Sequence, residues 1–274
     1  MNVAAVYGLV LAGGHSSRMQ RDKAALPYQG QPQLQRAYEL LSRHCARTFI
    51  SIRPDQQQDE LRARWPQIVD EQTSLGPLAG IAAAQAQHPH AAWLVIACDL
   101  PMLNEQAVQL LLQQRDATRF ATAYRGSDRQ PEPLCVIWEP HSAASIRAAI
   151  AAGKLSPRTL LQTSDALLID PVNIEALNNV NTADEYHRSS SAMNTLSLHL
   201  QYFAIFREQA GKRIETLETP ANTPALLYAE LQQRHGFKLA ATQLKVAVNN
   251  SFCDWQQSLK SGDHVAFIPP VAGG

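Results

Sequence analysis

The sequence predicts two domains: an α/β domain with a mostly parallel sheet, then a small α+β domain. In residues 1–186, apolar runs of strand length alternate with amphipathic stretches of helix length, which is typical of a parallel sheet covered by helices on both faces. A polar, serine-rich stretch at residues 187–194 is interpreted as a linker. Residues 195–274 then change to alternating strands around one helix. The chain has 274 residues, which is comfortable for two domains.

In the first domain, short apolar runs bounded by turn residues predict the strands. These strands are residues 6–11, 48–52, 93–97, 121–124 and 134–138. Apolar residues with the helical period predict helices between them, at residues 33–45, 78–87, 105–114 and 142–152. Ligands of such sheets bind beyond the carboxyl ends of the strands. Gly13, Gly14 and Asp99 each follow a strand, so we expect them to share one crevice.

The second domain shows two strand patterns on each side of one helix. The predicted strands are residues 196–206, 213–217, 244–248 and 264–268, with a turn at residues 210–211. Thr223 and Pro224 fit the N-cap and the first helical position of a helix that ends near His235. The resulting ββαββ order indicates a ubiquitin-like β-grasp fold.

Composition excludes several classes of protein. Lys+Arg and Asp+Glu both number 24, so no overall positive charge favours a nucleic-acid partner. No apolar run approaches the length of a membrane span, and the N-terminus lacks the charged start of a signal peptide. The 4 cysteines form no C-x-x-C pair, which argues against a zinc site or a disulfide framework. We therefore expect a cytoplasmic protein with no membrane partner.

A glycine-rich segment follows the first predicted strand and reads LVLAGGHSSRMQRDK. Gly13 and Gly14 lack a Cβ, so their backbone N–H groups can approach an anion closely. Arg18 and Lys23 supply cations at short range. The order of glycines fits neither the dinucleotide-binding nor the Walker motif. The segment predicts a triphosphate-binding loop; the alternative is an ordinary strand-to-helix turn with solvated charges.

This segment resembles the signature L-A-G-G-x-S-x-R-M-G-x-D-K of the molybdenum cofactor guanylyltransferases. The positions in register are Leu11, Ala12, Gly13, Gly14, Ser16, Arg18, Met19, Asp22 and Lys23, while Gln20 stands where the family usually has glycine. The resemblance implies a Rossmann-like nucleotidyltransferase domain of the glycosyltransferase-A-like class. It also implies GTP as substrate and molybdopterin, or its molybdenum form, as acceptor. In this family the residues from Leu11 to Gly14 and Lys23 bind the nucleotide, and Arg18 and Lys23 are catalytic.

A carboxylate follows the most apolar predicted strand, in the segment Cys98-Asp99-Leu100-Pro101. A buried Asp needs a cation or hydrogen-bond donors, and Mg²⁺ prefers carboxylate oxygens together with substrate phosphates. The segment resembles the family's C-D-x-P turn, which implies that Asp99 is a catalytic residue, a nucleotide contact and the Mg²⁺ ligand. The alternative is an Asp that caps the helix after Pro101. Cys98 is expected to be a packed side chain and not a nucleophile.

Two further segments bear on the base of the nucleotide. Asp70 ends a short apolar stretch, and a G-P-L-A-G segment follows. The resemblance implies that the nucleotide contacts Asp70 and the segment Gly76, Pro77, Leu78, Ala79 and Gly80. An Asp suits guanine because its two oxygens can accept from N1–H and from the exocyclic amine. Ser51 stands where the family often has an Asn that contacts the nucleotide, and this departure leaves room for another base. For residues 76–77 the alternative is an ordinary Gly-Pro turn before a helix.

The acceptor side is indicated by two more resemblances. The segment R-Q-P-E-P-L, which contains Pro133, is similar to the family segment that lines this side. Residues 179–185 resemble the closing motif N-V-N-T-x-[DE]-[DE], which places Asn179 and Asn181 on the pterin side. Thr182 and Glu185 also form a capping box, so helix initiation explains part of this motif.

The C-terminal residues 259–274 resemble the end of the small subunit of molybdopterin synthase, a ubiquitin-like sulfur carrier. Gly273 and Gly274 have no side chains and can thread a narrow channel. The resemblance implies that a MoeB-like adenylyltransferase activates Gly274, and that the resulting thiocarboxylate delivers sulfur inside the large subunit of molybdopterin synthase. The alternatives are a thiamin-type sulfur carrier and a flexible terminus of small residues.

The combined hypothesis is transfer of GMP from GTP to the phosphate of molybdopterin by the first domain, with a sulfur carrier as the second. The expected partners are the large subunit of molybdopterin synthase, the adenylyltransferase, and molybdoenzymes or cofactor-delivery proteins. Two alternatives stay open. One is a cytidylyl- or sugar-phosphate nucleotidyltransferase with the same fold, and the other is a non-catalytic adaptor that carries the second domain.

Overall fold

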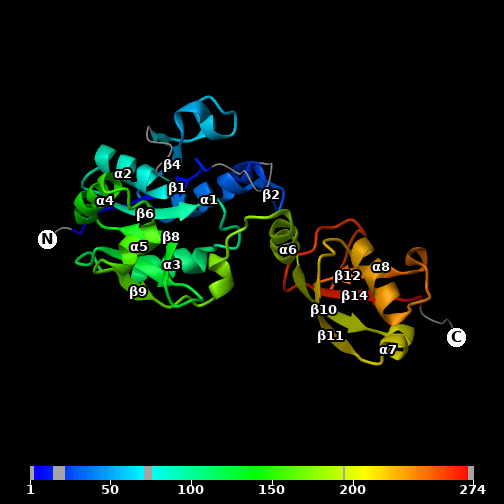
Figure 1. Cartoon of the computed structure of the whole chain (residues 1–274). Helices are drawn as coiled ribbons and strands as arrows, with labels where there is room; N and C mark the ends of the chain where they lie inside the picture. The colour runs from blue at the N-terminus through cyan, green and yellow to red at the C-terminus, as the bar shows by residue number, and fades with distance from the viewer. Residues whose placement is uncertain (1–2, 15–21, 71–75, 194, 271–274) are drawn as a thin grey trace. The chain divides into compact units, whose positions relative to one another are not determined.

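The computed structural model describes residues 3–14, 22–70, 76–193 and 195–270 (Figure 1). The chain divides into two compact units, Met1–Ser189 and Ser190–Gly274, here called the first and the second unit. No helix among the described residues is both long enough and apolar enough to cross a bilayer.

The described residues of the first unit form a seven-stranded sheet in the order β5-β4-β1-β6-β8-β7-β9. Its strands are β1 (Val6–Leu11), β4 (Arg47–Ile52), β5 (Gln67–Val69), β6 (Ala92–Ala97), β7 (Ala121–Arg125), β8 (Pro131–Trp138) and β9 (Leu167–Ile169). Pairing is parallel from β5 to β6 and between β7 and β9, and β8 alone runs antiparallel to both its neighbours. The expected mostly parallel α/β sheet is therefore confirmed.

Helices cover both faces of this sheet (Figure 1). They are α1 (Gln33–Ser42), α2 (Pro77–Gln87), α3 (Glu105–Gln113), α4 (Ala143–Ala151) and α5 (Pro157–Gln162). Strand β6 is buried along its whole length and divides its side chains between two cores. Leu94 and Ile96 pack with α1 and α3, whereas Trp93 and Val95 pack with α2 and α4. A strand buried on both faces must be apolar throughout, as its sequence predicted.

Short elements complete the first unit. The strands β2 (Pro27–Tyr28) and β3 (Gln31–Pro32) pair as a small hairpin. The 3₁₀ turns are η1 (Lys23–Ala25), η2 (Pro54–Gln56), η3 (Arg62–Arg64), η4 (Pro140–Ser142) and η5 (Ile174–Leu177). Turn η1 begins with Lys23 and turn η3 begins with Arg62, and both residues lie next to the glycine-rich segment.

The boundary between the two units falls within the expected linker at residues 187–194, and this stretch is helical up to Met193, as part of helix α6 (Ala183–Met193). The capping box starts this helix: Thr182 Oγ1 accepts from Glu185 N at 3.2 Å, and Glu185 Oε2 accepts from Thr182 N at 3.1 Å. Tyr186 then anchors the first turns through a bond from its hydroxyl to Pro27 O at 2.9 Å. Serine disfavours a helix only mildly, so a well-capped and anchored helix continues through the serine-rich stretch.

The second unit is a β-grasp-like α+β domain with a five-stranded sheet in the order β11-β10-β14-β12-β13. Its elements are β10 (Leu196–Tyr202), α7 (Ala204–Ala210), β11 (Ile214–Thr219), α8 (Pro224–His235), η6 (Ala241–Gln243), β12 (Lys245–Val248), β13 (Ser251–Phe252) and β14 (His264–Ile268). Strand β10 is antiparallel to β11 and parallel to β14. Thr223 caps α8 as expected, since its side chain accepts from Leu226 N.

One expectation about the second unit is wrong. The first strand ends at Tyr202 instead of reaching Phe206, and helix α7 follows. Tyr202 and Phe206 are buried, while Phe203 and Ile205 between them are exposed. In a strand, Ala204 would share the buried face with Tyr202 and Phe206, but Ala204 is exposed, which fits a helix. Phe206 packs against Phe237 with ring centroids 4.5 Å apart, which fixes this helix on the core.

Candidate functional site

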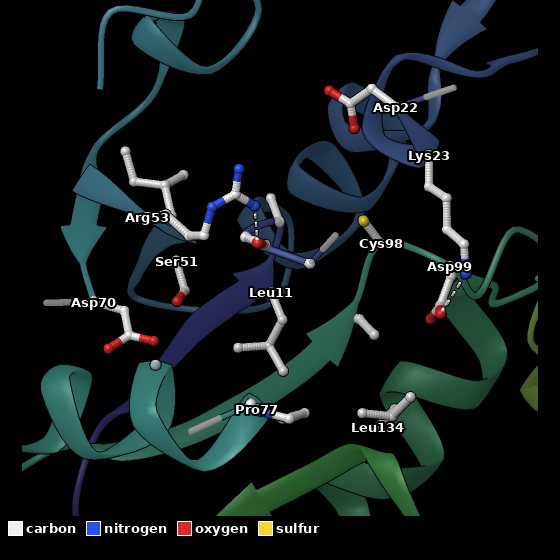
Figure 2. A pocket seen from close by; sticks show the side chains of 17 residues that line it. Leu11, Asp22, Lys23, Ser51, Arg53, Asp70, Pro77, Cys98, Asp99 and Leu134 are labelled. Atoms are coloured by element: carbon white, nitrogen blue, oxygen red, sulfur yellow. Dashed lines mark hydrogen bonds and ion pairs between the residues drawn. The ribbon is translucent and has the colours of Figure 1, made fainter. Parts of the chain in front are cut away.

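A pocket of about 330 Å³ lies at the carboxyl ends of β1, β4 and β6 in the first unit (Figure 2). Gly13, Gly14 and Asp99 all line it, so the expected shared crevice exists. Figure 2 shows Lys23 and Asp99 on one side of the pocket and Asp70 with Ser51 on the other. One end of the pocket therefore carries the ion pair of Lys23 and Asp99, and the other end carries the polar side chains of Asp70 and Ser51.

Most of the predicted nucleotide contacts line this pocket. They are Leu11, Ala12, Gly13, Gly14, Lys23, Ser51, Asp70, Gly76, Pro77, Gly80 and Asp99. Leu78 and Ala79 do not line it, because they are buried at 0% and 4% exposure beneath the surface of α2. Successive residues of a helix point about 100° apart, so Pro77 and Gly80 can face the pocket while Leu78 packs into the core.

The glycines of the G-P-L-A-G segment have separate structural reasons. Gly76 has φ 65° and ψ −155°, a conformation essentially restricted to glycine, and it stands immediately before α2. At Gly80, an added Cβ would lie 2.3 Å from Ser51 Oγ. Helix α2 thus approaches strand β4 so closely that position 80 has no room for a side chain.

Lys23 joins two distant parts of the sequence at the edge of the pocket. Its Nζ donates to Asn181 Oδ1 at 2.6 Å and to Asp99 Oδ2 at 3.3 Å. Val180 N donates to Asp99 O at 2.9 Å, which places the N-V-N-T segment directly beside the carboxylate. Less than a fifth of the Lys23 and Asp99 side chains is exposed, so little water screens their attraction.

Asp99 keeps one oxygen uncommitted. Oδ1 of Asp99 is buried and has no hydrogen-bond partner among the described residues, and the same is true of Asn179 Oδ1. Helix α3 takes its cap from Asn104, whose side chain accepts from Ala107 N at 3.0 Å, so the alternative of Asp99 as a helix cap is wrong. A buried carboxylate oxygen without a donor suits a hard cation such as Mg²⁺.

Cys98 lines the same pocket but is not activated. Burial raises the pKa of its thiol to about 12, and the charge of Asp99 acts in the same direction. A thiol in this state is not a nucleophile near neutral pH, as expected. All four cysteines are unpaired.

Some predicted residues lie elsewhere. Arg18, together with Ser16, Met19 and Gln20, falls outside the described residues, and so do Gly273 and Gly274. Pro133 is partly exposed on β8 and does not line the pocket, although its neighbour Leu134 does. Asn179 and Asn181 also lie outside the lining, but Asn181 reaches the site through Lys23.

Two arginines at the site escaped the sequence analysis. Arg53 lines the pocket and donates to the Gly13 carbonyl, as Figure 2 shows. Arg62 is buried at 2% exposure and donates to the Ala12 carbonyl and to Asp22. Burial alone would raise the pKa of Asp22, but the hydrogen bonds and the positive charge of Arg62 outweigh it and lower that pKa. No local sequence pattern distinguishes Arg62, because the polar residues next to it in the sequence are typical of an exposed segment.

Comparison with known families agrees with this geometry. Residues 8–171 match the family model of the MobA-like NTP transferase domain. The chain belongs to the MobA-like NTP transferase family. Residues 200–274 match the ThiS family. The two matches fall on the two units of the fold.

Several known proteins are similar to this chain. A molybdenum cofactor biosynthesis bifunctional protein of Synechocystis is 40% identical over 182 residues, covering 66% of this chain and 52% of that protein. This chain thus spans about half the length of that relative. A probable molybdenum cofactor guanylyltransferase of Mycobacterium tuberculosis is 32% identical over 186 residues, covering 66% of this chain and 90% of that protein.

Among solved structures, molybdopterin-guanine dinucleotide biosynthesis protein A of Archaeoglobus fulgidus matches with a TM-score of 0.58 and 22% identity. The match covers 68% of this chain and 97% of that one. At this level of identity the likeness concerns the fold.

Proposed function

We propose that the first unit transfers GMP from GTP to the terminal phosphate of molybdopterin, or of its molybdenum form, and releases pyrophosphate. One observation carries the proposal: Lys23, Asp99 and Asn181 meet at the edge of the pocket that also holds the glycine pair. The molybdenum cofactor guanylyltransferase named among the relatives supports the choice of reaction.

In the proposed reaction, an oxygen of the acceptor phosphate attacks the α-phosphorus of GTP in line with the leaving group. One P–O bond forms at phosphorus and the P–O bond to the β-phosphate breaks, so pyrophosphate leaves with the electron pair. Positioning and charge neutralisation dominate such a transfer. The amides of Gly13 and Gly14, with Arg18, would hold the triphosphate, and Lys23 would offset the charge that develops on the transferred phosphoryl group.

Asp99 Oδ1, which is buried without a hydrogen-bond partner among the described residues, would hold the Mg²⁺. The ion supplies charge neutralisation of the phosphate oxygens when it is bound. Lys23 holds Asp99 Oδ2, so the lysine orients the carboxylate and leaves Oδ1 for the cation. Asn181, and with it Asn179 and Pro133, would border the acceptor pterin.

The base is assigned to the opposite end of the pocket. Asp70 would accept from the guanine edge, with Ser51, Gly76, Pro77 and Gly80 as the surrounding wall. Ser51 is a shorter side chain than the family's usual Asn, which keeps CTP as an alternative substrate. A sugar phosphate in place of the pterin is the alternative acceptor.

We propose that the second unit is a sulfur carrier whose Gly273–Gly274 end is activated by a MoeB-like adenylyltransferase and then serves the large subunit of molybdopterin synthase. The match to the ThiS family supports this role. An apolar hollow of about 230 Å³ on the sheet of this unit, with Phe252 exposed at its edge, would receive these partners. Molybdoenzymes or delivery proteins would take the product of the first unit.

The test is pyrophosphate release by the purified protein with Mg²⁺ and molybdopterin, comparing GTP, CTP and ATP. Release with GTP alone supports the guanylyltransferase. Release with CTP keeps the mechanism and overturns the base assignment. No release with any nucleotide, with an authentic guanylyltransferase as positive control for the pterin, favours the non-catalytic adaptor. Deleting Gly273 and Gly274 should abolish molybdopterin synthesis if the sulfur carrier is active.

A further inference from the structure

Arg62 connects the two ends of the glycine-rich segment from beneath the site. Its Nε and Nη2 donate to Ala12 O at 3.3 Å and 3.1 Å, on the N-terminal side of the two glycines. Its Nη1 and Nη2 donate to the two oxygens of Asp22 at 2.7 Å and 3.0 Å, immediately before Lys23. Asp59 Oδ1 holds the same guanidinium at 3.1 Å.

We propose that Arg62 is a positioning residue that places the amide of Gly13 and the ammonium of Lys23 for a triphosphate. This inference rests on the proposed function and extends it to a residue outside the pocket. Arg62 is 2% exposed and does not line the pocket. It therefore acts through the backbone of Ala12 and through Asp22 and does not itself touch the nucleotide.

Peptide geometry supplies the first half of the argument. In a trans peptide unit the C=O and the following N–H point in opposite directions, and the described chain contains no cis peptide bonds. The C=O of Ala12 points to Arg62, so the N–H of Gly13 in the same peptide unit points away from Arg62. Gly13 lines the pocket and Arg62 does not, and we infer that this N–H faces the pocket.

The second half concerns Lys23. Asp22 caps the turn η1 by accepting from Ala24 N at 3.1 Å, and Lys23 is the first residue of that turn. A guanidinium that holds both oxygens of Asp22 fixes the position from which the Lys23 side chain starts. Arg62 thus places the amide of Gly13 and the ammonium of Lys23 relative to each other, which a single-point donor such as Lys cannot do.

The experiment compares Arg62→Lys with Arg64→Lys, a matched control on the same turn whose side chain is 56% exposed. Calorimetry measures binding of inorganic tripolyphosphate and of guanosine to the full chain. Arg62→Lys should bind tripolyphosphate about tenfold more weakly, as expected for misaligned charge-assisted hydrogen bonds, and guanosine unchanged. Arg64→Lys should bind both like the wild type.

Folded Arg62→Lys protein that binds tripolyphosphate like the wild type would overturn the proposal. An equal loss of guanosine binding would also overturn it, because the effect would then be general damage to the pocket. If Arg62→Lys does not fold, Asp59→Asn replaces it, since Asp59 holds the same guanidinium and does not line the pocket. A loss of about threefold or more in tripolyphosphate affinity supports the proposal, and a smaller loss overturns it.

A different result would contradict the proposed function without contradicting the role of Arg62. Wild-type protein that binds tripolyphosphate but releases no pyrophosphate from any nucleotide would contradict the transferase assignment. The Arg62 comparison would still decide the positioning role, because it measures binding of an anion and not turnover.

Discussion

Two largely buried carboxylates with charged neighbours, Asp99 in the first unit and Glu215 in the second, differ in how completely they are hydrogen-bonded. In the second unit, Glu215 uses both oxygens: Oε2 accepts from Tyr202 and His235 at 2.7 Å and 2.9 Å, and Oε1 accepts from Lys212 at 3.1 Å. In the first unit, Asp99 has Lys23 on Oδ2 and no described partner on Oδ1.

The comparison separates a carboxylate whose oxygens are all hydrogen-bonded from one that can still bind a ligand. A buried carboxylate oxygen without a hydrogen-bond donor costs free energy, which a bound cation would offset. Glu215 has nothing left to bind, and its cluster stabilises the β-grasp. Asp99 keeps Oδ1 without a described hydrogen bond beside Lys23, in the pocket to which the proposed function assigns the nucleotide.

The largest expected effect comes from removing Asp99. Asp99→Ala should lower the rate of pyrophosphate release by about a thousandfold or more, because the proposed cation loses its carboxylate. The thermal midpoint of unfolding should fall only slightly, since the variant loses the long bond from Lys23 to Oδ2 but Lys23 keeps its bond to Asn181. Glu215→Gln is the control and should keep full turnover. Normal turnover by Asp99→Ala would end the transferase assignment.

The variant Lys23→Ala should cause the second-largest loss of turnover. The ammonium bonds both Asp99 and Asn181, and we expect kcat to fall about a hundredfold with a smaller change in KM. Steady-state kinetics with GTP separates the two constants. Asn181→Ala removes one of these bonds and should lower kcat less than Lys23→Ala does. A larger fall in kcat would mean that Asn181, and not Lys23, contributes most to turnover.

Filling the space at position 80 tests the other end of the pocket. In Gly80→Ala the new Cβ would collide with Ser51 Oγ, so we expect a loss of about 1 to 3 kcal/mol in unfolding free energy, measured by urea denaturation. The double variant Ser51→Ala with Gly80→Ala should recover part of this loss. Independent, additive effects would contradict the close packing of α2 on β4.

The smallest effect is a pH dependence confined to the second unit. Burial alone would raise the pKa of Glu215, but hydrogen bonds from Tyr202, Lys212 and His235 outweigh it and lower the pKa below the ordinary 4.5. A pKa lowered by folding stabilises the protein above the unfolded value, and this contribution disappears as the pH falls below about 4.5. Glu215→Gln should weaken the acid dependence of unfolding followed by circular dichroism. An unchanged acid profile would mean that the cluster is not coupled to folding.

Periodic and local signals in the sequence predicted much of the fold. Strand β1 and strand β14 match their expected bounds, because alternating or continuous apolar runs end at clear turn residues. Helix α7 was missed because Phe203 and Ile205 look like strand residues when burial is unknown. The helical conformation of residues 187–193 was not predicted, because a capping box and an anchoring Tyr186 outweigh a serine-rich composition.

The site was predictable where a motif is contiguous and unpredictable where contacts are long-range. Gly13, Asp70 and Asp99 could be found from their positions after strands. Arg62 could not, because its partner Ala12 lies fifty positions earlier and nothing local distinguishes it from Arg64. Leu78 and Ala79 were included with the glycines next to them because a motif does not show which face of a helix each residue occupies.

The start of helix α6 has a practical consequence for dissecting the protein. Glu185 Oε2 accepts from Asn181 N at 2.7 Å as well as from Thr182 N, so the helix cap also holds the residue that contacts Lys23. Tyr186 and Ser189 fasten the next turns to the β2 hairpin. A gene truncated after codon 186 would cut this helix near its beginning, whereas a stop after codon 193 would preserve it. The stand-alone transferase should therefore be expressed to Met193.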